Sequence, residues 1–330
     1  MMIRAIAARV CFGTLLSRLA WSVGAAIIAA GTAATQPGQD SRVSANFLQL
    51  TRASTWILER SQPLTFPTYH PQGLVKIGDT LFISSVEIRV PTRRSANRAD
   101  GFDRDTGEGV GHLFKVSSAG ALVHDLVIGE GTMYHPSGLD FDGTHIWVAA
   151  AEYRPDSRSI VYRVDPATMK ATEMFRFDDH LGGLVKNRDD NTLHAVSWGS
   201  RWFYHWTLDQ AGRPTDRSTP REKMRTANPS HYVDYQDCKY AGEGRMLCSG
   251  IADIARSGEK PLQLGVIDLI DLRSGLPVHQ LPVGLTTANG ISLTRNPSFF
   301  EATGDGVRAY FLPEDDKSTL YVYRIGAAKD

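Results

Sequence analysis

Short apolar runs separated by turn residues recur along most of the chain. Five segments share an entry of the form His-Pro-x-Gly-Leu, or a degenerate version of it, and these entries begin at His70, His135, His180, Asp234 and Thr287. Successive entries therefore lie 65, 45, 54 and 53 residues apart. A repeat of this length suits a unit of four strands with a loop of variable length.

Each entry leads through a turn into a second apolar run and then into a third. The second runs cover residues 81–86, 146–151, 193–198, 246–251 and 309–312, and the third cover 112–116, 160–164, 203–208, 264–269 and 320–325. Asp142-Gly143 is one of the turns, and Asp-Gly between apolar runs is a strong hairpin signal. Four repeats continue into a weaker fourth strand, such as 174–177 or 278–283. The pattern predicts an all-β protein built from four-stranded antiparallel units.

The fifth repeat lacks a fourth strand, and the chain offers a spare one ahead of the first entry. The fifth repeat ends after its third strand at Ile325, whereas residues 55–66 form a strand-like segment. If this segment completes the fifth repeat, the ring closes and leaves only short, protected edges. We therefore predict a five-bladed β-propeller over residues 47–326, closed by an N-terminal strand. Six blades is the alternative because the first repeat carries an insertion over 91–111, which we interpret as a loop since it has no apolar period.

The repeat motifs resemble those of a large superfamily of secreted propellers. The Gly-Leu entries, the Asp142-Gly143 hairpin and the third-strand sequence Tyr162-Arg163-Val164-Asp165 resemble NHL-repeat, gluconolactonase and strictosidine-synthase-like proteins over about residues 47–326. The chain is also similar to a group of exported bacterial propellers with no assigned function. Lactonases of the superfamily hold calcium through acidic and Asn side chains at the inner-strand entries, typically the Asn of Asn-Gly. Only Asn289-Gly290 matches that pattern here, so the resemblance implies the fold but does not carry over the calcium site.

Polar side chains are expected to gather at one mouth of the central channel. The first two strands of a blade run antiparallel, so the entry of the first and the end of the second lie on the same face. The entries carry His70, His135, His180 and Asp234. The ends of the second strands carry Glu87, Glu152 and the pair Glu314-Asp315.

These residue types suggest metal chemistry on a small substrate. Imidazoles beside carboxylates favour Zn, Fe, Cu or Ni over Ca. The sequence therefore predicts one divalent metal on His70, His135 and His180 of a hydrolase or lyase. Its catalytic carboxylates would be Glu87 and Glu152, one of them a further ligand or the general base. The predicted ligand-binding residues are Gln72, Asp234, Gln236, Asn289, Glu314, Asp315 and Trp198.

Three other interpretations stay open. Paired carboxylates act as acid and base without a metal in glycosidases. The same mouth can bind a small molecule, a glycan or a protein without any chemistry. Polar residues at blade entries also cap strands, and duplication copies them from repeat to repeat. The sequence contains no Gly-x-Ser-x-Gly, Walker, His-Glu-x-x-His or Cys-x-x-Cys motif, so it gives no support to those enzyme classes.

The first 34 residues have the composition of an export signal. They hold Arg4, Arg9 and Arg18, no acidic residue, and a run of small apolar residues over 20–34. We predict cleavage near Ala34 and a secreted or periplasmic protein with no stable membrane span; a retained membrane anchor is the alternative. We interpret residues 35–46 as a flexible linker and 327–330 as a tail.

Cleavage would change the charge balance of the whole chain, which has 36 basic and 36 acidic residues. It leaves 296 residues, enough for one large domain, with 33 basic and 36 acidic side chains, a net charge of about −3. Nothing in this balance favours nucleic acid as a partner.

Two cysteines remain after cleavage, Cys238 and Cys248. They flank a turn over residues 241–245, and a hairpin centred on Glu243 would place them opposite each other. Such neighbours have Cβ atoms about 4.5–5.5 Å apart, which is near bridging distance. The spacing predicts a disulfide, with two buried free thiols as the alternative.

Overall fold

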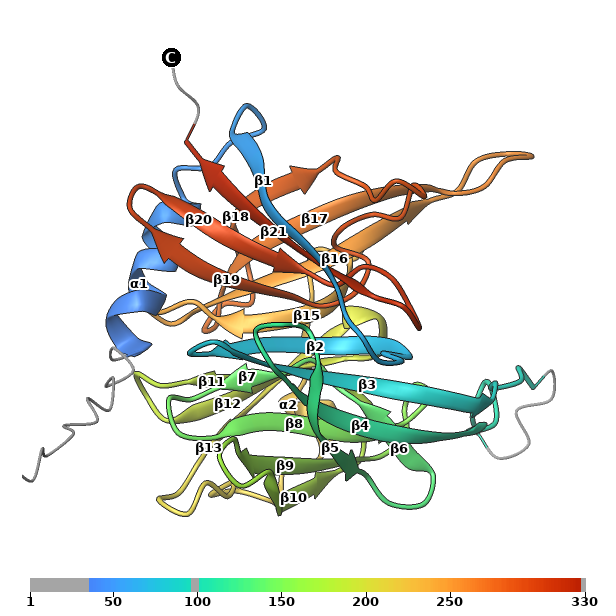
Figure 1. Cartoon of the computed structure of the whole chain (residues 1–330). Coiled ribbons are helices and arrows are strands. Elements are labelled where there is room, and N and C mark those ends of the chain that lie inside the picture. Colours follow the sequence, from blue (N-terminus) through green and yellow to red (C-terminus); the bar gives the residue numbers. More distant parts are fainter. Residues whose placement is uncertain (1–35, 96–100, 328–330) are drawn as a thin grey trace, which may run out of the picture. The chain divides into compact units, whose positions relative to one another are not determined.

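The computed structural model describes residues 36–95 and 101–327, and almost all of its regular structure is β-strand (Figure 1). The helical segments are α1 (Gln36–Phe47), the single 3-10 turn η1 (Trp198–Ser200) and the four-residue α2 (Arg221–Met224). Within the described ranges, no helix combines the length and the apolar character needed to cross a membrane. The all-β prediction is confirmed.

The strands form five antiparallel sheets, the blades of a β-propeller. Blade 1 contains β2 (His70–Ile77), β3 (Thr80–Val90), β4 (Glu108–Val116) and β5 (Leu122–Ile128). Blade 2 contains β6 (Met133–Pro136) and β7 (Asp140–Phe141) as a split inner strand, then β8 (Ile146–Glu152), β9 (Ser159–Asp165) and β10 (Lys170–Phe177). Blade 3 contains β11 (Leu181–Asn187), β12 (Thr192–Ser197), β13 (Trp202–Thr207) and β14 (Thr226–Ala227). Blade 4 contains β15 (Asp234–Tyr240), β16 (Arg245–Ile254), β17 (Leu262–Asp271) and β18 (Pro277–Val283).

Blade 5 takes strands from both ends of the described chain. Its order is β19 (Ser298–Thr303), β20 (Gly306–Phe311), β21 (Thr319–Gly326) and β1 (Thr55–Pro63). Strand β1 pairs antiparallel with β21 along its whole length. Five blades closed by an N-terminal strand are therefore confirmed. The six-blade alternative is wrong because β3 and β4, which flank the insertion, pair directly with each other.

The predicted entry of the fifth inner strand is displaced from the observed one. Residues 287–291 form a tight turn, in which the backbone N–H of Thr287 donates to the Ile291 carbonyl at 2.8 Å. The inner strand β19 begins only at Ser298. Asn-Gly is a strong turn sequence because both residues tolerate positive φ, and Gly290 has φ 77°. Asn289-Gly290 therefore marks a turn, and Asn289 is exposed to solvent.

Residues 36–46, predicted to be a flexible linker, belong to helix α1 instead. Val43 and Phe47 are buried among core residues of blades 4 and 5, and Leu50 follows just after the helix. The four-residue spacing of Val43 and Phe47 places these two side chains on one face of the helix. Figure 1 shows α1 beside β19, and the Asn46 side-chain amide donates to the Gly306 carbonyl at 2.7 Å.

Buried charges fill the middle of the channel. The Asp237 carboxylate contacts the Lys239 ammonium and also accepts a hydrogen bond from the backbone N–H of Leu74 at 2.9 Å. The Asp140 carboxylate accepts one from the backbone N–H of Lys186 at 2.8 Å. These contacts join inner strands of different blades.

A disulfide crosses the inner hairpin of blade 4. Cys238 on β15 lies directly opposite Cys248 on β16, and their sulfur atoms are bonded. Both residues are buried.

Candidate functional site

One mouth of the channel contains a cavity of about 150 Å³, which we call the histidine cavity. Its walls are His70, Gln72, His135, Tyr153, His180, Gly182, Ser197, Trp198, Gly199, Asp234, Tyr235 and Gln236. A cavity of this volume holds a molecule about the size of benzene. Seven of the predicted site residues lie together in these walls: His70, His135, His180, Gln72, Asp234, Gln236 and Trp198.

β-bulges at the strand entries help to direct side chains into the cavity. The pairing register shifts around Gln72 in β2, around Gly182 in β11 and around Gln236 in β15. A bulge leaves one residue unpaired and bends the strand, which re-aims its side chain. All three bulged residues line the histidine cavity. The same irregularity is therefore repeated in three blades at the cavity, where it can re-aim the side chains of Gln72 and Gln236, whereas Gly182 brings only backbone to the wall.

Four aromatic rings form a continuous wall of the cavity. His135 stacks on Tyr153 with ring centroids 4.3 Å apart, and Tyr153 contacts Trp198 at 5.4 Å. Trp198 meets the edge of His180 at 4.8 Å, and His180 lies 5.4 Å from His135, which closes the circuit. Each of the four rings therefore packs against two of the others.

His70 is held by a carboxylate at the edge of the cavity. Its Nδ1 atom lies 2.8 Å from Oδ1 of Asp315. Asp315 also accepts hydrogen bonds from Arg295 at 3.0 Å and from Asn296 at 2.9 Å. Burial opposes ionisation of Asp315, but the hydrogen bond from His70, then Asn296 and Arg295, outweigh it and lower the pKa. An ionised Asp315 fixes the Nδ1–H tautomer of His70, so Nε2 carries the free lone pair.

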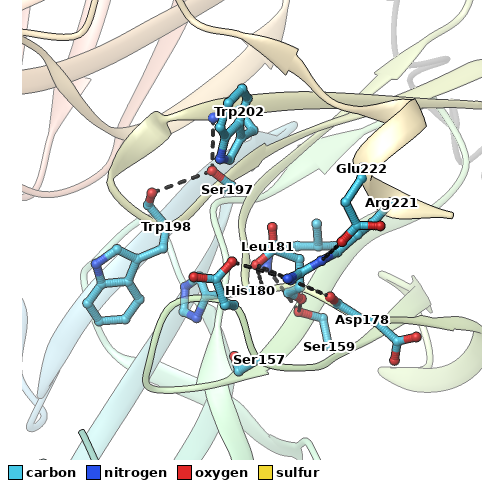
Figure 2. Close-up of polar contacts among 12 residues, drawn as sticks. Ser157, Ser159, Asp178, His180, Leu181, Ser197, Trp198, Trp202, Arg221 and Glu222 are labelled. Atoms are coloured by element: carbon cyan, nitrogen blue, oxygen red, sulfur yellow. Dashed lines mark hydrogen bonds and ion pairs between the residues drawn. The ribbon is translucent and has the colours of Figure 1, made fainter. Parts of the chain in front are cut away.

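His180 is held both at its ring and at its backbone. Its Nδ1 atom lies 2.8 Å from the Glu152 carbonyl oxygen, and its backbone N–H donates to Asp179 at 2.8 Å. Figure 2 shows His180 beside Trp198, with Arg221 bound to the Asp178 carbonyl next to it. Burial lowers the pKa of His180 to about 4, so the ring is neutral at physiological pH.

His135 is the most enclosed of the three imidazoles. Burial, followed by the nearby His180 and His70, lowers its pKa well below the usual range. Its Nδ1 atom is buried and has no hydrogen-bond partner within residues 36–95 and 101–327. The cavity therefore holds a neutral imidazole with an unsatisfied polar atom.

The pKa of Asp234 is shifted in the opposite direction from that of Asp315. Burial raises the pKa of Asp234, and Arg201 only partly offsets this. Burial also raises the pKa of Tyr153, Arg104 opposes the rise, and both Asp315 and Asp234 add to it. Asp315, whose own pKa is lowered, and Asp234, whose own pKa is raised, therefore both interact electrostatically with the Tyr153 hydroxyl.

The remaining predicted residues lie outside the cavity walls. Glu152 is buried in ion pairs with Arg158 at 2.7 Å and Arg154 at 2.8 Å. Glu87 pairs with Arg89 at 2.8 Å. Glu87 lies on β3 and Glu152 on β8, which are the second strands of their blades counted from the axis. Both side chains form ion pairs with arginines of the same blade. We therefore move the catalytic hypothesis away from these two glutamates.

The other two outliers have local structural partners. Glu314 accepts hydrogen bonds from the Tyr321 hydroxyl at 2.8 Å and from the backbone N–H of Thr319 at 3.1 Å. Asn289 lies in the exposed turn described above. Sequence reasoning missed Tyr153, which immediately follows Glu152. The sequence did contain an indication, because Tyr153 is a large aromatic residue directly after a buried strand. The catalytic role was assigned instead to the carboxylate of Glu152 beside it.

The three histidines were also predicted to bind one divalent metal. Among the residues that the structure describes, no three His, Cys, Asp or Glu side chains are grouped as a metal site. The predicted metal on His70, His135 and His180 therefore stays a prediction.

Comparisons with known proteins identify a family and a fold. The model of a family of unknown function, DUF6454, matches residues 37–328. No curated protein matches the chain. A mannose phosphorylase from Leishmania mexicana is 12% identical, with a TM-score of 0.50 over 85% of this chain and 91% of that one.

Two further solved structures have lower TM-scores. A luciferin-regenerating enzyme is 11% identical, with a TM-score of 0.42 over 81% of this chain and 95% of that one. The periplasmic gluconolactonase of Pseudomonas aeruginosa is 16% identical, with a TM-score of 0.34 over 79% and 87%. At 12% identity, the likeness to the mannose phosphorylase shows the propeller fold alone, and the predicted superfamily stays a prediction.

Proposed function

The chain belongs to the DUF6454 family of unknown function, and we propose that it is a hydrolase or lyase that acts on a small organic molecule in the histidine cavity. The observation that carries this proposal is the contact between His70 and Asp315. A carboxylate that fixes the tautomer of an imidazole beside a cavity is the arrangement of a general base.

Asp234 supplies the complementary general acid. Carboxyl groups whose environments push their pKa values apart take opposite roles in acid–base catalysis. In a hydrolysis, Nε2 of His70 accepts a proton from water as the water oxygen attacks. Asp234 then gives its proton to the leaving oxygen as the old bond breaks. The neutral rings of His135 and His180 and the amides of Gln72 and Gln236 orient the substrate.

A panel of small esters, lactones and hydroxy acids tests this mechanism. We expect His70→Asn and Asp234→Asn each to lower kcat/KM by about a hundredfold or more. His124→Asn, an exposed histidine on β5, is the matched control and should leave the rate unchanged. Equal turnover by wild type and His70→Asn would contradict the proposal. Binding of panel members without turnover would favour the alternative of a non-catalytic ligand-binding propeller.

A divalent metal is the second candidate, and a specific observation favours it. Metal-ligating histidines usually donate their second ring N–H to a carboxylate or a backbone carbonyl. His70 makes this contact with Asp315 and His180 makes it with the Glu152 carbonyl, while Nδ1 of His135 has no partner among the described residues. This chemistry supports Zn, Fe, Cu or Ni over Ca.

Metal analysis of the purified protein, followed by chelation, tests the second candidate. We expect about one metal ion per chain and a fall in unfolding temperature after chelation. The triple variant His70→Ala, His135→Ala, His180→Ala should contain no metal and should not respond to chelator. Wild-type protein with no stoichiometric metal would remove the metal from the mechanism and leave the acid–base proposal in place.

We also propose that the chain is exported. The basic and apolar character of residues 1–34 supports this, although that segment lies outside the described residues. The disulfide between Cys238 and Cys248 is typical of an oxidising compartment. The mass of the protein isolated from the periplasm or medium should correspond to a chain that begins near residue 35. Full-length protein in the membrane fraction would instead support the retained anchor.

A further inference from the structure

The insertion between β3 and β4 contacts the walls of the histidine cavity. The Arg104 guanidinium lies over the ring of Trp198, with its central carbon 4.9 Å from the ring centroid. Nearby, the Tyr134 hydroxyl donates to the Thr106 carbonyl at 2.6 Å, which ties the insertion to blade 2. The sequence predicted a loop over residues 91–111, and Arg104 of this loop brings a cation from blade 1 to a cavity wall of blade 3.

Arg104 is held in place but still has free donors. Its Nε and Nη2 atoms bind the two carboxylate oxygens of Asp103 at 3.0 and 2.9 Å. A guanidinium has five N–H donors, so this pair leaves three of them unused. Arg104 makes no other hydrogen bond to any residue in the described part of the chain. Its side chain is only 15% exposed, so a ligand that reaches it is partly shielded from water.

The charges around the cavity leave room for an anion. Asp315 is bound by His70 and Arg295, so its charge is already compensated. Asp234 is the acid of the proposed reaction, and burial raises its pKa, which favours its neutral form. Neutral His135 and His180 add no charge. Arg104 lies behind Trp198 rather than in the cavity wall itself, and its charge is shared with Asp103. An acidic group of a ligand that extends past Trp198 would therefore meet the three unused donors of Arg104.

From this geometry we propose that Arg104 selects a small organic acid by binding its carboxylate. The inference rests on the proposed function, because it names the substrate class of the same cavity. The planar guanidinium matches the two oxygens of a carboxylate. Trp198 and Asp103 hold it in position before binding, so little conformational freedom is lost.

Calorimetric titration with pairs of acids and their primary amides tests the proposal. Lactate and lactamide have the same number of non-hydrogen atoms and are the first pair. We expect wild-type protein to bind the acid about tenfold more tightly or better. In Arg104→Gln this preference should disappear, while the affinity for the amide stays the same. Arg225→Gln removes another arginine stacked on a tryptophan, at 4.3 Å from Trp202, and should keep the preference.

The variant His70→Asn separates this inference from the proposed function. It should lose turnover but still prefer the acid, because the carboxylate contact lies at Arg104. Acid preference without turnover by wild type would support the inference and contradict the enzyme proposal. Turnover of neutral compounds with no preference for the acid in binding would support the enzyme proposal and contradict the inference about Arg104. Equal affinity for acid and amide, no binding of either by wild type, or a preserved preference in Arg104→Gln would overturn the inference.

Discussion

Asp237 accepts a hydrogen bond from the backbone N–H of Leu74, 2.9 Å away, and so joins the inner strands of blades 4 and 1 across the channel. The same carboxylate contacts the buried Lys239 ammonium. Removing one partner of a buried ion pair leaves an uncompensated charge, at a cost of about 3–5 kcal/mol. We expect Asp237→Leu to lower the free energy of unfolding in urea by that amount.

The double variant Asp237→Leu, Lys239→Met provides the control for this prediction. It removes both charges, so it should recover most of the lost stability. If the double variant is as unstable as Asp237→Leu, the backbone contact with Leu74 is the main contribution and the ion pair is secondary.

Asp140 should give the protein a distinctive pH dependence. Burial raises its pKa to about 7, against the opposing effects of Lys239 and of backbone N–H groups such as that of Lys186. Between about pH 4 and 7 the folded state holds a proton that the unfolded state has released. This contribution to stability is therefore complete below about pH 4 and is lost as the pH rises through 7, by at most about 1.4 kcal/mol per pH unit.

Asp140→Asn isolates this contribution from that of other groups. Buried His180, whose pKa is lowered, has the opposite effect, because its contribution is lost as the pH falls. The informative quantity is the difference in unfolding free energy between wild type and Asp140→Asn, measured in urea from pH 5 to 8. We expect the advantage of wild type to shrink as the pH rises; a constant difference would contradict the assignment.

The periodic features of the fold could be predicted from sequence, and so could the part of the site that shares the period. His70, His135, His180 and Asp234 lie at equivalent entries, so recognising the repeat was enough to place them around one axis. Glu152 shows the limit of this reasoning. Strand polarity placed it at the correct end of β8, but the side chain that lines the cavity is that of Tyr153, the first residue after the strand.

Contacts outside the repeat could not be predicted in the same way. Arg104 lies in an insertion with no apolar period, so nothing in its sequence indicated a contact with Trp198, which is far away along the chain. The prediction of a strand entry at Asn289 failed because its local sequence fits two structures. Its Asn-Gly sequence fits both a strand entry of the family pattern and a turn, and the turn is what the backbone forms.

The disulfide of blade 4 should contribute measurably to stability. Cys238 and Cys248 are 10 residues apart, and closing a loop of this size stabilises the folded state by about 3 kcal/mol. Cys238→Ala, Cys248→Ala should lower the unfolding free energy by a similar amount. Maleimide labelling of unfolded, unreduced protein should detect neither thiol, and labelling after reduction should detect both. Labelling of both without reductant would show that the bond does not form in the cell.

Helix α1 should behave as part of the propeller rather than as a leader attached to it. Phe47 is fully buried and meets the edge of the His279 ring at 5.5 Å. Truncating a buried phenylalanine leaves a cavity and costs about 3–5 kcal/mol. We expect Phe47→Ala to lower the urea midpoint accordingly, whereas Gln49→Ala, two residues further on and exposed, should leave it unchanged. A Phe47→Ala variant as stable as wild type would return residues 35–46 to the flexible linker that the sequence predicted.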